Sequence, residues 1–361
     1  MKSTSGVRYI ALDHVRALAA FMVFTWHFLH FGMGHPPVAD DVVPLFPFSV
    51  LDEGHTGVAL FMALSGYLFA KLLDGKSVDY RAFFWNRALR LLPLLLFVLL
   101  IVGILKYANG ANLHEYAISV AKGVLWPTLP NGGWSITVEA HFYLLLPLLV
   151  LALRKSRWLL PGIVLAAIAL RAFLHHVNGE VQSLAYFTLV GRIDQFVLGM
   201  LAWSLRSWFA KRHAIALLVA TAFMLFYWYF DLHGGFRHSP SFPSPRAIWI
   251  LLPTIEAIAY AACIAWYDNS FSPSTTGISG FVGRIGEYSY SIYLLHVFFT
   301  GRIGRWMYEQ GIQIPNFYVA CAWSLLFFLL MVVPGYLSYR FVESPFLRLR
   351  KRYLRAVPAM V

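Results

Sequence analysis

Two ionisable side chains, Arg16 and His27, lie inside one apolar segment that covers about residues 9–31. Ionisable residues at membrane depth are costly, and they usually face a cavity or a partner group. At about 100° and 1.5 Å per residue, eleven residues of helix bring both side chains to one face, about 16 Å apart along the axis. This arrangement is hard to explain as packing, and it indicates two points of one polar pathway.

Composition sets the broad class of protein. Apolar residues make up 59% of the 361 residues and charged residues only 13%, about half the charged fraction of a soluble domain. Cys263 and Cys321 lie alone in separate apolar segments, so no disulfide or thiolate–metal framework is available. We therefore expect an all-α integral membrane protein.

Apolar segments near the 20 residues that cross a bilayer recur along the whole chain. They cover about 9–31, 55–73, 88–107, 134–153, 157–174, 185–205, 213–231, 246–267, 284–302 and 317–340. The stretch 113–126 is shorter and contains Glu115 and Lys122, which favours a re-entrant or interfacial piece. The sequence predicts a bundle of about ten transmembrane helices.

Charge in the loops gives these spans a direction. Lys and Arg concentrate before the first span, in every second loop and after the last span, whereas residues 32–54 contain none. Basic loops stay on the cytoplasmic side, so we expect both termini in the cytoplasm of a multi-pass protein of the inner or plasma membrane, in contact with membrane lipids. This distribution explains most of the +12 net charge, and no nucleic-acid partner is needed.

The third span begins with a pair of arginines, Arg87 and Arg90. Their spacing puts them on one face at the cytoplasmic end, where two guanidinium groups could clamp a phosphate or pyrophosphate. The alternative is ordinary anchoring of the helix at the cytoplasmic headgroups.

The fourth span opens with Trp134 and carries Glu139 in its second turn. A carboxylate in the membrane needs a proton or a cationic partner, and His27 is predicted at a similar depth. Glu139 would then fix the tautomer of His27 and favour its protonated form during base catalysis. The alternatives are a purely structural pair and, for Trp134, an interfacial-belt residue.

Polar residues in two further spans are candidates to support the substrate or the fold. Ser65 and Gly66 permit close approach of a neighbouring helix or of an acyl chain. Arg192 and Asp194 are two residues apart and cannot face each other, so each needs a partner on another helix.

His296 and Glu343 lie near the ends of the last two spans. His296 suits an interior group as well as a reagent, and Glu343 is placed to neutralise Arg87, Arg90 or Arg340. No HExxH motif, nucleophile elbow or P-loop is present, so we expect no metal ion and no permanently bound cofactor.

Together these motifs resemble the membrane acyltransferase-3 family, which includes O-antigen, peptidoglycan and Nod-factor O-acetyltransferases. The resemblance rests on LDHVRALAAFMVFTWH (Arg16, His27), FMALSGYL (Ser65), RALRLLP (Arg87, Arg90), WSITVEAHFYLLLP (Trp134, Glu139), RIDQFVLGM (Arg192, Asp194), YSYSIYLLH (His296) and FVESP (Glu343). It implies a single transmembrane acyltransferase domain over 1–361, with a core of about 9–347 and no SGNH domain. It also implies acyl-CoA, usually acetyl-CoA, as co-substrate and a sugar hydroxyl as acceptor.

The resemblance and the predicted geometry together suggest an O-acetyltransferase. Arg87 and Arg90 would hold the CoA phosphates at the cytoplasmic side. The pantetheine arm would pass Arg16 and bring its thioester near His27. The resemblance implies that His27 occupies the position regarded as catalytic in the family. His27, oriented by Glu139, would act as base or acyl carrier toward a glycan or lipid-linked sugar at the outer face. A proton-coupled transporter with His27 and Glu139 as relay groups is the alternative, and a non-enzymatic membrane scaffold is a third.

Overall fold

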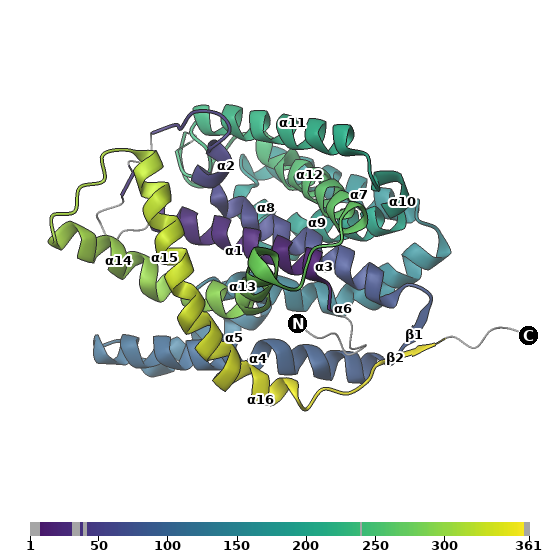
Figure 1. Ribbon diagram of the computed structural model, residues 1–361, viewed down its shortest axis with the longest axis horizontal. Helices are drawn as coiled ribbons and strands as arrows, with labels where there is room; N and C mark the ends of the chain where they lie inside the picture. The colour runs from purple at the N-terminus through teal and green to yellow at the C-terminus, as the bar shows by residue number, and fades with distance from the viewer. Residues whose placement is uncertain (1–7, 31–36, 39–41, 239, 357–361) are drawn as a thin grey trace, which may run out of the picture.

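The computed structural model describes residues 8–30, 37–38, 42–238 and 240–356 and is built almost entirely of helices (Figure 1). The α-helices are α1 (Ile10–His30), α2 (Ser49–Asp52), α3 (Gly57–Leu73), α4 (Tyr80–Ala108), α5 (Leu113–Leu125), α6 (Gly133–Lys155), α7 (Leu159–Asn178), α8 (Gln182–Phe187), α9 (Leu189–Ser204), α10 (Arg206–Phe209), α11 (His213–Leu232), α12 (Ile248–Ser270), α13 (Gly277–Leu295), α14 (Val297–Glu309), α15 (Phe317–Ser338) and α16 (Ser344–Leu347). A 3-10 turn (Gly54–Thr56) precedes α3, and a π-helical turn (Tyr339–Glu343) follows α15. The predicted all-α class is confirmed.

Seven helical segments of the described chain are long and apolar enough to cross a membrane. They are Gly54–Leu73, Tyr80–Ala108, Gly133–Lys155, Leu159–Asn178, His213–Leu232, Ile248–Ser270 and Phe317–Leu347. Each of the seven matches a predicted span. A helix pairs its backbone N–H and C=O groups by internal hydrogen bonds, which makes it a stable form for such apolar sequences in lipid.

The other three predicted spans have features that weaken the apolar signal. The span 9–31 is α1, which carries Asp13 and Arg16. The span 185–205 is divided between α8 and the 16-residue α9. The span 284–302 is divided between α13 and α14, with His296 between them. The number of about ten spans therefore stays a prediction, and the stretch 113–126 forms the helix α5.

Local signals explain where several helices begin. The side chains of Asp79, Thr188 and Asn316 precede α4, α9 and α15 and accept hydrogen bonds from backbone N–H groups of the first helical turn, at 3.0–3.1 Å. These caps satisfy donors that the helix itself leaves without partners.

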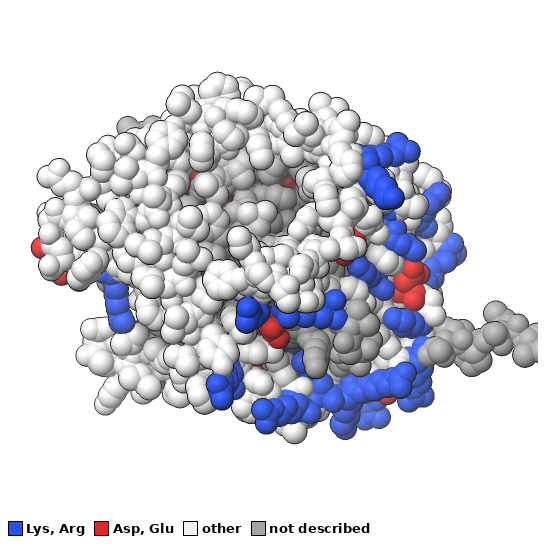
Figure 2. Space-filling view, in the orientation of Figure 1, with Lys and Arg blue, Asp and Glu red and all other residues white. Residues whose placement is uncertain are grey.

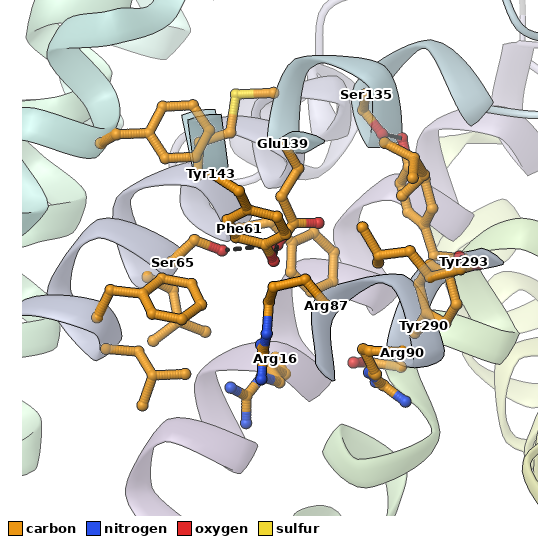
Figure 3. A pocket seen from close by; sticks show the side chains of 18 of the residues that line it. Arg16, Phe61, Ser65, Arg87, Arg90, Ser135, Glu139, Tyr143, Tyr290 and Tyr293 are labelled. Atoms are coloured by element: carbon orange, nitrogen blue, oxygen red, sulfur yellow. Dashed lines mark hydrogen bonds between the residues drawn. The ribbon is translucent and has the colours of Figure 1, made fainter. Parts of the chain in front are cut away.

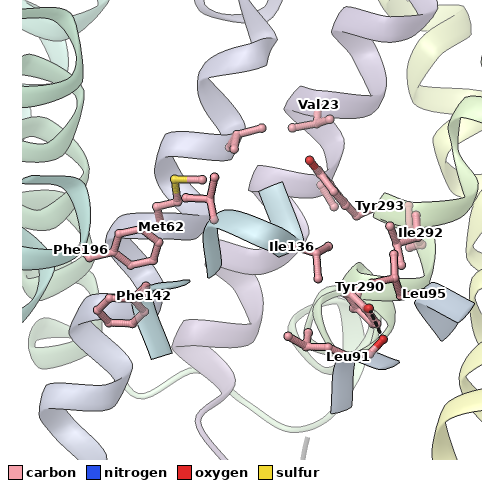
Figure 4. Packing of buried hydrophobic residues seen from close by; sticks show 14 of the residues in the cluster. Val23, Met62, Leu91, Leu95, Ile136, Phe142, Phe196, Tyr290, Ile292 and Tyr293 are labelled. Atoms are coloured by element: carbon pink, nitrogen blue, oxygen red, sulfur yellow. Dashed lines mark hydrogen bonds between the residues drawn. The ribbon is translucent and has the colours of Figure 1, made fainter. Parts of the chain in front are cut away.

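The centre of the bundle is formed where α3 packs along α9 and α1 packs along α13. The rings of Phe142 on α6 and Phe196 on α9 stack there, with centroids 4.0 Å apart, and the Tyr290 hydroxyl donates to the Leu91 carbonyl oxygen at 2.7 Å (Figure 4). This buried core fixes the positions of the helices that carry the polar site.

Gly66 lets α3 and α9 approach at backbone distance. A Cβ at Gly66 would overlap the carbonyl group of Phe196, and one at Gly199 would overlap the carbonyl oxygen of Ala63. The sequence predicts that either a neighbouring helix or an acyl chain approaches Ser65 and Gly66. For Gly66, the structure shows a neighbouring helix.

Replacing Gly66 with alanine is expected to lower the free energy of unfolding by about 1–3 kcal/mol, the usual cost of overpacking. Thermal unfolding of the detergent-solubilised protein measures the loss. The matched control is Gly162→Ala on α7, where a Cβ meets nothing within 4 Å. Equal stability of the two variants would contradict the close packing of α3 on α9.

Basic side chains gather at one end of the molecule. Figure 2 shows Lys and Arg along the edge where α10, α16 and the strands β1 (Lys76–Val78) and β2 (Leu354–Ala356) lie, whereas the opposite end is largely uncharged. The two strands pair antiparallel, with Ser77 opposite Arg355. The chain therefore has one strongly basic end, as the loop charges predicted.

Candidate functional site: two cavities that meet inside the bundle

A deep cavity opens among α1, α3, α4, α6 and α13. Its empty volume is about 1250 Å³, its open mouth included, and four arginines (Arg16, Arg87, Arg90, Arg350) and two carboxylates (Asp13, Glu139) line it. We call it the Arg pocket. Figure 3 shows the guanidinium groups of Arg16, Arg87 and Arg90 on one side of it, with Ser135 on the other. The structure thus brings together all three arginines predicted to hold the donor.

Each of the predicted arginines is held by a different kind of contact. Arg16 donates to the Asp13 carboxylate at 2.6 Å, and its side chain is 19% exposed. Arg90 pairs with Glu343 and lies over the ring of Tyr290. The predicted role of Glu343 as the neutralising partner of an arginine is confirmed for Arg90.

Arg87 is surrounded by aromatic rings. Its guanidinium carbon lies 5.3 to 5.9 Å from the ring centroids of Phe69, Phe83 and Tyr143. Its Nε atom is buried and has no hydrogen-bond partner among the described residues. A guanidinium held on aromatic faces keeps its N–H donors for a ligand.

Glu139 projects into the same cavity from α6. It accepts hydrogen bonds from the Ser65 hydroxyl at 3.3 Å and from the Tyr143 hydroxyl. Ser65 therefore faces the cavity, while its neighbour Gly66 faces α9. Glu139 is a polar wall of the Arg pocket.

A second cavity holds His27. It has an empty volume of about 1000 Å³, and aromatic residues supply much of its wall. They are Trp26, Trp134, Tyr186, Phe187, Phe236, Phe242 and Tyr293. We call it the His pocket. Val58 and Tyr293 line both cavities, so the two cavities meet there.

The tautomer of His27 follows from its backbone contact. Nδ1 lies 2.8 Å from the Val23 carbonyl oxygen, and a carbonyl can only accept, so Nδ1 carries the proton. The neutral ring then has its proton-accepting lone pair on Nε2. The His27 ring also packs edge-on against His296, with centroids 4.4 Å apart. His296 Nδ1 approaches the Tyr293 carbonyl oxygen in the same way.

The predicted pairing of Glu139 with His27 is wrong. Glu139 bonds to Ser65 and Tyr143 in the Arg pocket, whereas His27 is oriented by the Val23 carbonyl in the His pocket. Glu139 of α6 lines the Arg pocket and not the His pocket, whereas His27 lines the His pocket. The contacts that orient the His27 ring come from the Val23 carbonyl oxygen and the His296 ring instead of the Glu139 carboxylate.

Arg192 and Asp194 find partners outside their own helix, as their spacing predicted. Asp194 accepts from Arg171 of α7 at 2.8 Å, and both side chains are fully buried. Arg192 donates to the Tyr186 carbonyl oxygen. Its guanidinium carbon lies 4.2 Å from the ring centroid of Tyr186 and 5.6 Å from that of Trp134. Arg192 thus supports the aromatic wall of the His pocket. Trp134 is part of that wall and not only an interfacial residue.

Three carboxylates lie together beside the His pocket. Single oxygens of Asp52, Glu53 and Asp231 lie within 4.8 Å of one another, a spacing that a metal ion could bridge. The Glu53 oxygens, however, already accept from the His55 ring at 2.8 Å and the Phe236 N–H at 3.0 Å. These contacts describe a hydrogen-bonded support for the pocket wall, and we route no chemistry through a metal ion.

Sequence reasoning missed several residues of the two cavities. Asp13 lies three residues before Arg16, and Tyr143 lies four residues after Glu139, which are the spacings of neighbours on a helix; both could have been found. Arg350 belongs to the basic segment after the last predicted span, and nothing in the local sequence distinguishes it from Arg348 or Arg352.

The fold and the site therefore define a helical membrane protein in which an arginine-lined cavity adjoins a histidine-containing one. The family model described as an acyltransferase domain, Acyl_transf_3, matches residues 9–338. The chain belongs to this membrane acyltransferase family, as its motifs predicted. No solved structure matches it.

Several of the similar curated proteins come from strains of Staphylococcus aureus, and two of them illustrate the likeness. One, from strain COL, is named "Putative O-acetyltransferase" and is 23% identical over 97% of this chain and 59% of its own length. The other, O-acetyltransferase OatA from strain NCTC 8325 / PS 47, is 25% identical over 85% of this chain and 54% of its own length. The chain thus spans between half and three fifths of these relatives.

Proposed function

We propose that this protein is a membrane-embedded O-acyltransferase that takes an acyl group, most simply acetyl, from cytosolic acyl-CoA. The acceptor is a hydroxyl of a cell-envelope glycan or glycolipid at the outer face of the inner or plasma membrane. The observation that carries the proposal is the meeting of the Arg pocket and the His pocket at Val58 and Tyr293. The names of the relatives agree with this reaction.

We assign the basic end of the molecule to the cytosol. The excess of Lys and Arg at this end supports the assignment. We propose with it the topology expected from the sequence, about ten spans with both termini in the cytoplasm. The Arg pocket would then receive the donor from the compartment in which acyl-CoA is made, and the His pocket would receive the acceptor from the other side.

The charged phosphates and the uncharged pantetheine arm of the donor are proposed to bind to different parts of the Arg pocket. Arg87, Arg90 and Arg16 would hold its phosphates, since guanidinium groups match phosphate geometry and form strong charge-assisted hydrogen bonds. The uncharged pantetheine arm would run past Ser65 and Glu139 toward Tyr293. The thioester would reach the His pocket, where the acceptor sugar lies against Trp134 and its aromatic neighbours.

In the reaction, Nε2 of His27 takes the proton of the acceptor hydroxyl. The hydroxyl oxygen attacks the thioester carbonyl carbon, the carbon–sulfur bond breaks, and the departing CoA sulfur receives the proton from His27. A second route begins with attack of Nε2 on the thioester carbonyl carbon, which breaks the carbon–sulfur bond, releases the CoA thiolate and forms an acyl-histidine. The acceptor hydroxyl oxygen then attacks the acyl carbon, the carbon–nitrogen bond breaks, His27 is regenerated, and the hydroxyl proton ends on the CoA sulfur. Rapid quenching without acceptor distinguishes the routes, because only the second leaves a labelled acyl group on the protein.

The test uses detergent-purified protein, acetyl-CoA labelled in the acetyl group and a panel of lipid-linked glycans. We expect consumption of the thioester and release of CoA, with label appearing as a base-labile ester on one glycan. If the protein neither binds nor consumes acetyl-CoA, the enzyme proposal fails. In that case, uptake of a solute driven by a proton gradient would favour the alternative function, a transporter in which His27 and Glu139 are relay groups.

A further inference from the structure

The chain that follows α16 runs along the Arg pocket and supplies part of its wall. Residues 348–353 lead into β2, which pairs with β1 just before α4 begins. Arg350 and Tyr353 of this segment line the cavity. We call residues 348–356 the C-terminal strap. It lies beyond residue 338, where the family match ends, so the match does not account for it.

The strap is fastened by specific contacts and not only by the two short strands. Asn86 of α4 is fully buried, and its amide clamps the backbone of Lys351, accepting from the N–H at 2.8 Å and donating to the carbonyl oxygen at 2.6 Å. The Asp79 N–H donates to the Tyr353 carbonyl oxygen at 2.9 Å. Tyr353 is 1% exposed and packs on Phe83. These contacts hold Arg350 in place at the cavity.

Arg350 adds positive charge where two arginines already lie. Burial lowers the pKa of Arg350, and the nearby Arg87 and Arg90 lower it further. Glu343 is bonded to Arg90, and Arg350 itself donates to the Leu347 carbonyl oxygen at 3.1 Å. Like charges held together in a partly buried site repel one another, and a bound anion would relieve that repulsion.

We propose that Arg350 is a further donor-binding residue, which the C-terminal strap presents beside Arg87 and Arg90 to the phosphate groups of the donor. The inference rests on the proposed function, since it takes the donor to be a phosphorylated nucleotide thioester. The strap thereby forms part of the wall of the donor site, and α4 carries both the arginine pair and the Asn86 clamp that positions Arg350.

The test compares two ligands on the purified full chain. CoA carries the phosphates, and pantetheine carries the same arm without them. Arg350→Gln is expected to weaken CoA binding about 10-fold or more, as the loss of a charge-assisted hydrogen bond would, and to leave pantetheine binding unchanged. The matched control is Arg352→Gln, two residues further along the strap and exposed, which is expected to change CoA affinity less than 2-fold.

Each outcome bears on one claim. If Arg350→Gln binds CoA like the wild type, or weakens CoA and pantetheine equally, the assignment of Arg350 to the phosphates is overturned. Equal weakening by Arg352→Gln would reduce the effect to general charge and also overturn it. If the wild type binds no CoA while remaining folded, it is the proposed function that fails. Asn86→Ala gives a second measure, with the same selective loss for CoA expected where the variant folds.

Discussion

Replacing His27 with alanine or glutamine is expected to lower the rate of acetyl transfer about 10²–10⁴-fold, the range contributed by general-base catalysis. The Nδ1 contact with the Val23 carbonyl leaves Nε2 as the proton acceptor, and neither replacement supplies a base there. Stopped assays with labelled acetyl-CoA and the acceptor identified in the glycan panel measure the loss. Binding of CoA is expected to persist, because the arginines proposed to hold it line the other cavity.

The matched control is His14→Gln. His14 lies on the same helix, bonds to Tyr267 and the Ser279 carbonyl oxygen, and lines neither cavity. We expect its transfer rate to stay within 2- to 3-fold of the wild type. A His27→Gln variant that folds, binds CoA and still transfers acetyl at the wild-type rate would remove His27 from the mechanism.

The second large effect is on stability. Asp194→Ala is expected to lower the free energy of unfolding by about 3–5 kcal/mol, the cost of leaving one charge of a buried pair uncompensated. Arg171 would keep its bonds to the Ile250 and Gly191 carbonyl oxygens and to Thr254, but its charge would have no carboxylate beside it. Chemical or thermal unfolding in detergent measures the difference.

Two comparisons make this prediction specific. Asp74→Asn removes the exposed pair with Arg206, whose side chains are 39% and 54% exposed, and is expected to cost less than about 1 kcal/mol. The double replacement Arg171→Met with Asp194→Leu removes both charges and is expected to recover much of the lost stability. If Asp194→Ala and Asp74→Asn are equally stable, the buried pair is not a major element of the fold.

The helices and the pathway on α1 could be predicted because each depends on one segment. Length and apolarity identify a spanning helix, and the period of the helix places Arg16 and His27 on one face. The structure puts Arg16 in one cavity and His27 in the adjoining one. The place of Arg87 and Arg90 on one face of α4 follows from the same local reasoning, whereas the pairing of Arg90 with Glu343 joins segments far apart in the chain.

Contacts between helices could not be predicted in the same way. Glu139 was placed correctly along α6, but the direction in which its side chain points depends on how α6 packs against its neighbours, and this is a property of the whole bundle. Arg350 illustrates the same limit, since its place at the cavity depends on strand pairing between residues 76–78 and 354–356. The breaks within two predicted spans, such as that at His296, were likewise invisible to a search for apolar length.

The meeting of the two cavities at Val58 and Tyr293 has a consequence for the cell that houses this protein. A continuous aqueous channel through a membrane conducts ions and dissipates the electrochemical gradient. Here an aliphatic and an aromatic side chain form the boundary between the two cavities, and a 2.8 Å hydrogen bond joins the hydroxyls of Tyr293 and Ser135. We expect this boundary to oppose the passage of hydrated ions, because bringing an ion into apolar surroundings is costly. On the proposed function, the enzyme would then pass an acyl group between two compartments without dissipating the membrane potential.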